Sequence, residues 1–210
     1  MAQLVIEFDC YRDPKGYRLV ETERPMRVVR NGKGHDPKDF QHSRPLSKTD
    51  SLFKIFANIA TTPQGVLDFV QRFGPLTEGG WDPKIGEDVN LVISNADHMR
   101  QLLRYASGNQ KGLGLPLSRH QATRSRSIDH QVIWDPATKS PKWELRPRTL
   151  LDALWWQLGQ ALTAGAQIRQ CEHCGDWFEA GRGTGRRLDA KFCCDEHRTA
   201  FNSLKRSRGK

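Results

Sequence analysis

Four cysteines crowd into the last forty residues of the chain, together with His197, in a spacing that suits a metal ion. Cys171 and Cys174 stand two residues apart, and Cys193, Cys194 and His197 follow after a gap of eighteen residues. The pattern is Cys-x2-Cys-x18-Cys-x3-His if Cys193 is the third ligand, or Cys-x2-Cys-x19-Cys-x2-His if Cys194 is. Thiolates and imidazole nitrogens are the ligands that zinc takes in structural sites. The spacing therefore predicts one zinc ion and leaves the third ligand open.

The residues around the cysteines suit a closed site. Gly175 directly follows the first pair and gives the backbone the freedom that a tight turn needs. Asp195 and Glu196 stand where the first turn of a helix favours acidic side chains, and Phe201 and Leu204 form an apolar stripe behind them. Four ligands leave no open coordination position, so we expect a structural metal rather than a catalytic one.

Other uses of cysteine fit the sequence less well. A redox Cys-x2-Cys motif normally accompanies a βαβ pattern, which is not found in this sequence. A secreted disulfide protein usually spreads an even number of cysteines along its length, whereas here Cys10 is isolated and the other four are clustered. The cysteines therefore favour metal ligation in a reducing compartment.

Positive charge gathers on the same segment. Residues 182–210 hold nine Lys and Arg against three Asp and Glu, a net charge of +6 out of +9 for the whole chain. Cations that contact phosphates bind nucleic acid without reading its sequence, so this charge favours a nucleic-acid-binding role over that of a solubilising terminus. The candidate contact residues are Arg182, Arg186, Arg187, Arg198, Lys205, Arg206 and Arg208.

The segment Cys-x2-Cys-Gly-x2-Phe, an Arg-rich loop, Phe192-Cys193 and a basic tail together resemble the CGNR-type, treble-clef-like zinc finger of bacterial proteins. The resemblance covers about residues 150–210, with His197 in place of the family's last Cys and without its Gly-Asn-Arg. It implies that a helical domain precedes the finger and that Cys193, which follows Phe192, is the third ligand. Proteins of this family are described as candidate stress-induced transcription regulators, which implies DNA rather than RNA as the partner.

Two other classes of function stay open. A metal-dependent nuclease needs a histidine base beside further metal ligands, but the seven histidines are dispersed along the chain, and no phosphate loop or nucleophile elbow is found. We therefore expect that the protein is not an enzyme. A protein-interaction adaptor fits as well, with a protein partner or a small ligand for the N-terminal part.

The remaining sequence predicts an α+β fold. Alternating apolar residues before Asn31 indicate two or three short strands, and the polar stretch 31–47 indicates a loop. Three helices should follow: one capped by Thr49 or Asp50, one from Thr62-Pro63 to Gly74-Pro75, and one from Ser94-Asn95-Ala96-Asp97 to Gly108.

Downstream, residues 127–146 indicate a hairpin, and an apolar helix should run from about Pro147 to Ile168, directly into the first cysteine. We expect an α+β domain at 1–168 and a zinc-knuckle-plus-helix module at 169–210. The charge-free stretch Ala153–Ile168 is too short and too polar to span a bilayer, and the N-terminus lacks the features of a signal peptide. We therefore expect a cytoplasmic protein without membrane contact.

Overall fold

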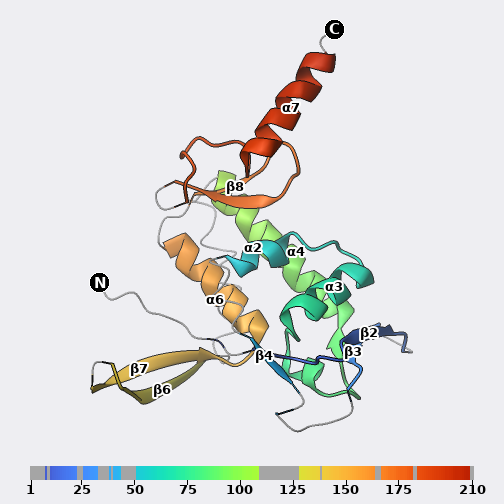
Figure 1. Cartoon of the computed structure of the whole chain (residues 1–210), viewed down its shortest axis with the longest axis vertical. Coiled ribbons are helices and arrows are strands. Elements are labelled where there is room, and N and C mark those ends of the chain that lie inside the picture. Colours follow the sequence, from blue (N-terminus) through green and yellow to red (C-terminus); the bar gives the residue numbers. More distant parts are fainter. Residues whose placement is uncertain are drawn as a thin grey trace.

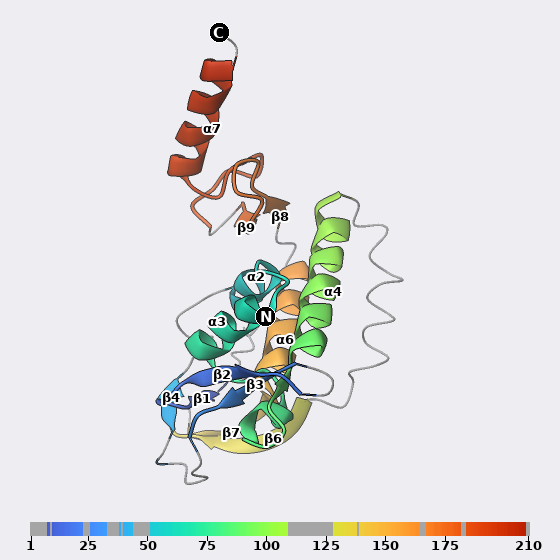
Figure 2. The same cartoon turned by 90° about the vertical axis from the view of Figure 1, so that its right-hand side faces the viewer.

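A computed structural model describes residues 8, 10–22, 26–32, 38, 40–43, 51–108, 128–137, 139–163, 167–181 and 184–208. Helices and small antiparallel sheets alternate along the chain without parallel pairing among these residues, which confirms the predicted α+β class. The helices gather in the middle of the molecule, most of the strands lie at one end, and the C-terminal helix projects from the other (Figures 1 and 2).

Two small sheets form near the N-terminus. β2 (Tyr17–Val20) pairs with β3 (Arg27–Arg30), and β3 pairs with β5 (Glu87–Asp88). β1 (Cys10–Arg12) pairs with β4 (Gln41–Ser43), which lies in the stretch predicted to be a loop. That prediction is wrong for β4 because its polar residues carry no apolar alternation, and only pairing with β1 makes them a strand. Leu4 and Ile6 belong to the apolar alternation before Asn31 that predicted strands, but they lie outside the described residues.

The first two predicted helices are present. α2 (Leu52–Ala57) has Ser51 as its N-cap, so the predicted cap at Thr49 or Asp50 is wrong; both of those residues lie outside the described part of the chain. α3 (Pro63–Phe73) begins after Thr62, whose hydroxyl accepts a hydrogen bond from the Gly65 backbone N–H at 3.1 Å. Gly74 ends α3 with a φ of 94°, a conformation that costs a residue without Cβ little.

The third helix begins earlier than predicted. After a 3₁₀ turn η2 (Glu78–Trp81), α4 runs from Val89 to Gly108, and the cap predicted at residues 94–97 is wrong. The Asp88 carboxylate, at the end of β5, accepts hydrogen bonds from the backbone N–H groups of Asn90 and Leu91 at 2.9 and 3.1 Å and so caps the helix. Asn95 lies inside the helix, where its amide donates to the Leu91 carbonyl. The described helix extends to Gly108, the predicted terminator, and the residues that follow lie outside the described part of the chain.

The last apolar helix is shorter than predicted. β6 (Ile128–Asp135) and β7 (Ser140–Pro147) form the predicted hairpin, and α6 spans Leu150–Thr163. Thr149 caps α6 by accepting from the Asp152 backbone N–H at 3.1 Å. The predicted helix from Pro147 to Ile168 should have led directly into the first cysteine. This prediction is wrong, because Ile168 belongs to a strand that pairs in a separate hairpin.

One apolar core holds most of the chain together. α2 contacts both α4 and α6, and α3 packs against α4 and the β2–β3 strands. Trp155 of α6 is buried in this core, while Trp156 is half-buried. The largest fully buried aliphatic and aromatic side chains are Phe53, Phe56, Leu52, Leu76, Met99, Leu102, Leu103, Leu150, Leu154 and Leu158. Across the described residues, none of the helices is long and apolar enough to cross a membrane.

The C-terminal module, residues 167–208, comprises the hairpin of β8 (Gln167–Gln170) and β9 (Trp177–Ala180), a loop, and α7 (Asp195–Arg208). Its hairpin rests on the helical layer, and α7 points away from the rest of the molecule (Figures 1 and 2). β8 begins at Gln167 and so crosses the predicted domain boundary between residues 168 and 169. Ile168 and Trp177 are buried in the main core, which joins the module to the N-terminal part.

Candidate metal centre

The structure brings three cysteines and one histidine together at one point of the C-terminal module. We call Cys171, Cys174, Cys193 and His197 the metal cluster; their ligand atoms all lie within 4.8 Å of one another. The Cys174 and Cys193 sulfurs are 3.8 Å apart, and the Cys171 sulfur lies 3.8 Å from His197 Nδ1. With zinc–sulfur bonds of about 2.3 Å, the edge of a tetrahedron is about 3.8 Å. The spacing can hold one metal ion.

A tight turn after β8 presents the first two sulfurs. The Gly175 backbone N–H donates to the Cys171 carbonyl at 2.9 Å, and the Cys171 N–H donates to the Asp176 carbonyl at 2.9 Å. Gly175 has a φ of 78°, which a residue without Cβ adopts at little cost. This turn is the conformation that the glycine after the second cysteine predicted.

The third and fourth ligand atoms come from the start of α7. Cys193 lies two residues before the helix, and His197 lies in its first turn. The Cys193 sulfur and His197 Nδ1 are 2.9 Å apart. The Glu172 N–H donates to the Lys191 carbonyl at 3.0 Å and so ties the first turn to the segment that carries Cys193. The ring of His173 lies beside His197, with centroids 4.9 Å apart, but His173 is not in the cluster.

Burial, backbone hydrogen bonds and the neighbouring ligands shift the pKa values of the three cluster thiols in different directions. Burial raises the pKa of Cys171, but hydrogen bonds from the backbone of Cys174, Cys193 and His173 outweigh it and lower that pKa to about 6. Burial and the neighbouring thiols raise the pKa of Cys193, and burial also raises the pKa of Cys174. A metal ion that binds here displaces protons from the thiols.

Cys194 does not belong to the cluster. Its sulfur lies 4.0 Å from that of Cys193, and it stands directly before the first residue of α7. Of the two spacings that the sequence allows, the cluster contains the one with Cys193. Cys10, the remaining cysteine, is fully buried far from the module, and its thiol donates to the Phe73 carbonyl at 3.1 Å.

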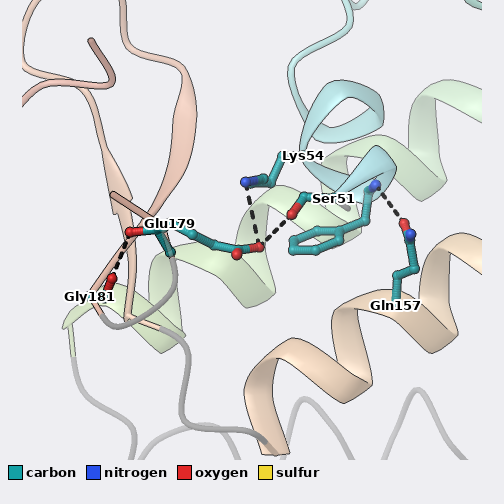
Figure 3. Close-up of polar contacts among 7 residues, drawn as sticks. Ser51, Lys54, Gln157, Glu179 and Gly181 are labelled. Atoms are coloured by element: carbon teal, nitrogen blue, oxygen red, sulfur yellow. Dashed lines mark hydrogen bonds and ion pairs between the residues drawn. The ribbon is translucent and has the colours of Figure 1, made fainter. Parts of the chain in front are cut away.

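A polar contact fixes the module to α2. The Glu179 carboxylate of β9 accepts from the Ser51 hydroxyl at 2.7 Å and lies 3.5 Å from the Lys54 ammonium (Figure 3). Beside it, the Trp177 backbone N–H donates to the Asn58 side chain at 3.2 Å. The position of β9, and with it the cluster, is therefore set by residues more than a hundred positions upstream. Local sequence patterns carry no signal for such a contact.

A hollow opens beside the cluster. It has a volume of about 560 Å³ and lies between the loop that starts at Thr184 and the first turn of α7. Its cationic side chains are Arg186, Arg187, Lys191 and Arg198, and we call it the cationic hollow. The Arg186 guanidinium donates through Nε to the Cys193 carbonyl at 2.7 Å. One wall of the hollow is thereby tied to a residue of the metal cluster.

The cations predicted to contact nucleic acid fall into two groups. Three of them, Arg186, Arg187 and Arg198, line the cationic hollow. Lys205 and Arg206 are exposed farther along α7, and Arg208 is the last residue of that helix. Arg182 lies outside the described residues. The sequence did not predict the hollow. Lys191 was included in the charge count of residues 182–210, but the sequence did not indicate that it lines a hollow.

No protein-family model matches the chain, and comparison with curated proteins finds no match either. The assignment of a function therefore rests on the site.

Proposed function

We propose that the chain is a zinc-binding protein whose C-terminal module binds nucleic acid, with DNA preferred over RNA, and that it acts in the regulation of transcription. Cys171, Cys174, Cys193 and His197 would hold one structural zinc ion. The single observation that carries the proposal is the convergence of these four side chains at the start of a cationic helix. Three sulfurs and one nitrogen form a donor set that suits zinc better than hard cations such as Mg²⁺ or Ca²⁺.

The zinc ion would organise the cations around it. It would hold the start of α7 against the turn at residues 171–175, so that Arg198 and the exposed Lys205 and Arg206 project from one rigid helix. Helix α7 points away from the remaining structure, which leaves it accessible to a long polymer (Figure 1). The resemblance of residues 150–210 to the CGNR-type zinc finger supports a role in transcription.

Salt dependence tests the nucleic-acid role. Binding through phosphates should make the logarithm of the affinity fall linearly with the logarithm of the salt concentration. Replacing both Arg206 and Arg208 by Ala should make this slope shallower by about one to two units, and by a similar amount on unrelated sequences. Fluorescence anisotropy with duplex DNA and single-stranded RNA, side by side at several salt concentrations, measures the slope.

Replacing Arg104 and Arg18 by Ala serves as the control, because both lie outside the C-terminal module and the same charge is removed. Absence of binding to either polymer at about 50 mM salt would overturn the nucleic-acid role, because the charge on this module should supply non-specific affinity under those conditions. Recovery of a protein partner that depends on residues 1–168, together with that absence, would favour the adaptor.

A further inference from the structure

The cationic hollow differs from an exposed basic surface in its charge, in its shape, and in the hydrogen bonds that tie its walls to the metal cluster. We infer that it is a binding site for one unpaired nucleotide, with the phosphate among the arginine side chains and the base against Phe192. The inference rests on the proposed nucleic-acid role and specifies that the module binds a single unpaired nucleotide of the polymer.

The charges of the hollow favour a phosphate. Its two carboxylates, Asp189 and Asp195, each lie 3.2 Å from an arginine of the same lining, Arg187 and Arg198 respectively. Arg186 has no carboxylate partner within the described parts of the chain; its Nε donates to a carbonyl. Lys191 lies 3.1 Å from the Glu172 carboxylate, which is not part of the lining. When this acid is counted with the other two, the four cations keep an excess of one positive charge, which Arg186 carries. Guanidinium groups bind phosphate oxygens with a matching planar fork.

The size and walls of the hollow favour a nucleotide over a bare anion. A volume of about 560 Å³ lies within the range of about 300–1,000 Å³ of small-molecule sites. Phe192 forms an apolar wall, and its ring is supported by Phe201, with ring centroids 5.2 Å apart. Nucleic-acid bases stack on such aromatic rings, but only an unpaired nucleotide offers its base and its phosphate to the same hollow.

The metal cluster supports two sides of the hollow. Arg186 is held by the Cys193 carbonyl, and the Lys191 carbonyl accepts from the Glu172 N–H in the turn between the first two ligands. Both contacts depend on the chain path that the metal ion would fix. Nucleotide binding should therefore need the metal-loaded protein.

The probe is 2′-deoxyadenosine 5′-monophosphate, titrated into the full-length, zinc-loaded protein, with deoxyadenosine and inorganic phosphate as separate ligands. The nucleotide should shift the backbone NMR signals of residues 184–198. Either fragment alone should bind at least about tenfold more weakly, because each makes only part of the contacts. Phosphate that binds as tightly as the nucleotide would overturn the inference in favour of a simple anion site.

Two matched double variants locate the site. Replacing Arg187 and Arg198 by Ala removes two charges from the hollow, and replacing Lys205 and Arg206 by Ala removes two from the exposed helix. The first variant should weaken nucleotide binding by at least about tenfold, and the second should change it by less than about twofold, because screened distant charges contribute little. Zinc content is measured in both. Equal losses would overturn the inference in favour of diffuse charge.

The two proposals fail in different ways. If both polymers bind with the expected salt slope while the nucleotide shifts no signal at residues 184–198, the nucleotide site is overturned and the nucleic-acid role stands. If the nucleotide binds while neither polymer does, the nucleic-acid role is overturned, and with it the assignment of the hollow to a polymer; the hollow is then a site for free nucleotides.

Discussion

At the scale of single residues, the surroundings shift the pKa values of two buried ionisable groups in opposite directions. Hydrogen bonds from three backbone N–H groups overcome burial and lower the pKa of Cys171 to about 6. The Glu87 carboxyl is 1% exposed, and burial raises its pKa to about 7 despite hydrogen bonds from the Thr77 backbone N–H and hydroxyl at 2.7 and 3.1 Å. The turn around Cys171 thus favours a charged sulfur, whereas the core at Glu87 disfavours charge.

Glu87 gives the fold a pH dependence that can be measured. Its pKa is higher in the folded protein than in the unfolded chain, so its contribution to stability is full below the unfolded pKa of about 4.3 and is lost as the pH rises through about 7. Between these values, wild type should lose stability relative to Glu87→Gln by up to about 1.4 kcal/mol per pH unit. Urea unfolding of both proteins at several pH values measures this difference. Parallel stability profiles would contradict the prediction.

At the scale of elements, α2 and β9 are joined by a charged contact that does not serve as a helix cap. Ser51 stands at the N-terminus of α2, yet its side chain makes no capping hydrogen bond and instead donates to Glu179. The Glu179 and Lys54 side chains are about one-fifth exposed, so solvent weakens their attraction only in part. This contact helps to fix the strand that follows the first two metal ligands.

Ser51→Ala should therefore destabilise the protein through the α2–β9 contact. We expect a loss of about 1 to 2 kcal/mol in the free energy of unfolding, because a partly buried carboxylate loses a hydrogen-bond donor. Ser107→Ala is the matched control: that hydroxyl donates to the Arg104 carbonyl at the exposed end of α4, and its loss should change stability by less than about 0.5 kcal/mol. Chemical denaturation measures both variants, and equal effects would argue against the contact.

At the scale of the whole molecule, two apolar cores differ greatly in size. Among the described residues, the main core spans the chain from Phe8 to Trp177, whereas the second core, in the module, has three buried members, Cys171, Phe178 and Ala180. So small a core supplies little folding free energy, and a bound metal ion would supply the rest. The main core contains none of the metal-cluster residues, so we expect the helical layer to stay folded without the metal.

Metal analysis and one pair of cysteine variants test whether a metal ion stabilises the C-terminal module but not the helical layer. Purified wild type should hold about one zinc ion per chain, and Cys174→Ser should lose it. Hydrogen exchange should then lose protection across α7 and the segment 184–194, while α3 and α4 stay protected. Cys194→Ser, which removes a thiol outside the cluster, should keep the metal and the protection. Wild type without zinc, or Cys174→Ser with an ordered module, would contradict a structural metal.

The sequence by itself determined the features that depend on neighbouring residues. The caps at Thr62 and Gly74 and the turn at Gly175 follow from local backbone chemistry, and the ligand spacing limited the third cysteine to two adjacent positions. The start of α4 has a local signal as well, the cap by Asp88, which the sequence interpretation overlooked. Only the tertiary structure decided that β4 is a strand and that β9 is held against α2. Both depend on a partner distant in sequence, since a pairing strand or a packed surface outweighs a weak local preference. The same holds for the cationic hollow, because charge can be counted along a chain but only folding gathers it around a shared space.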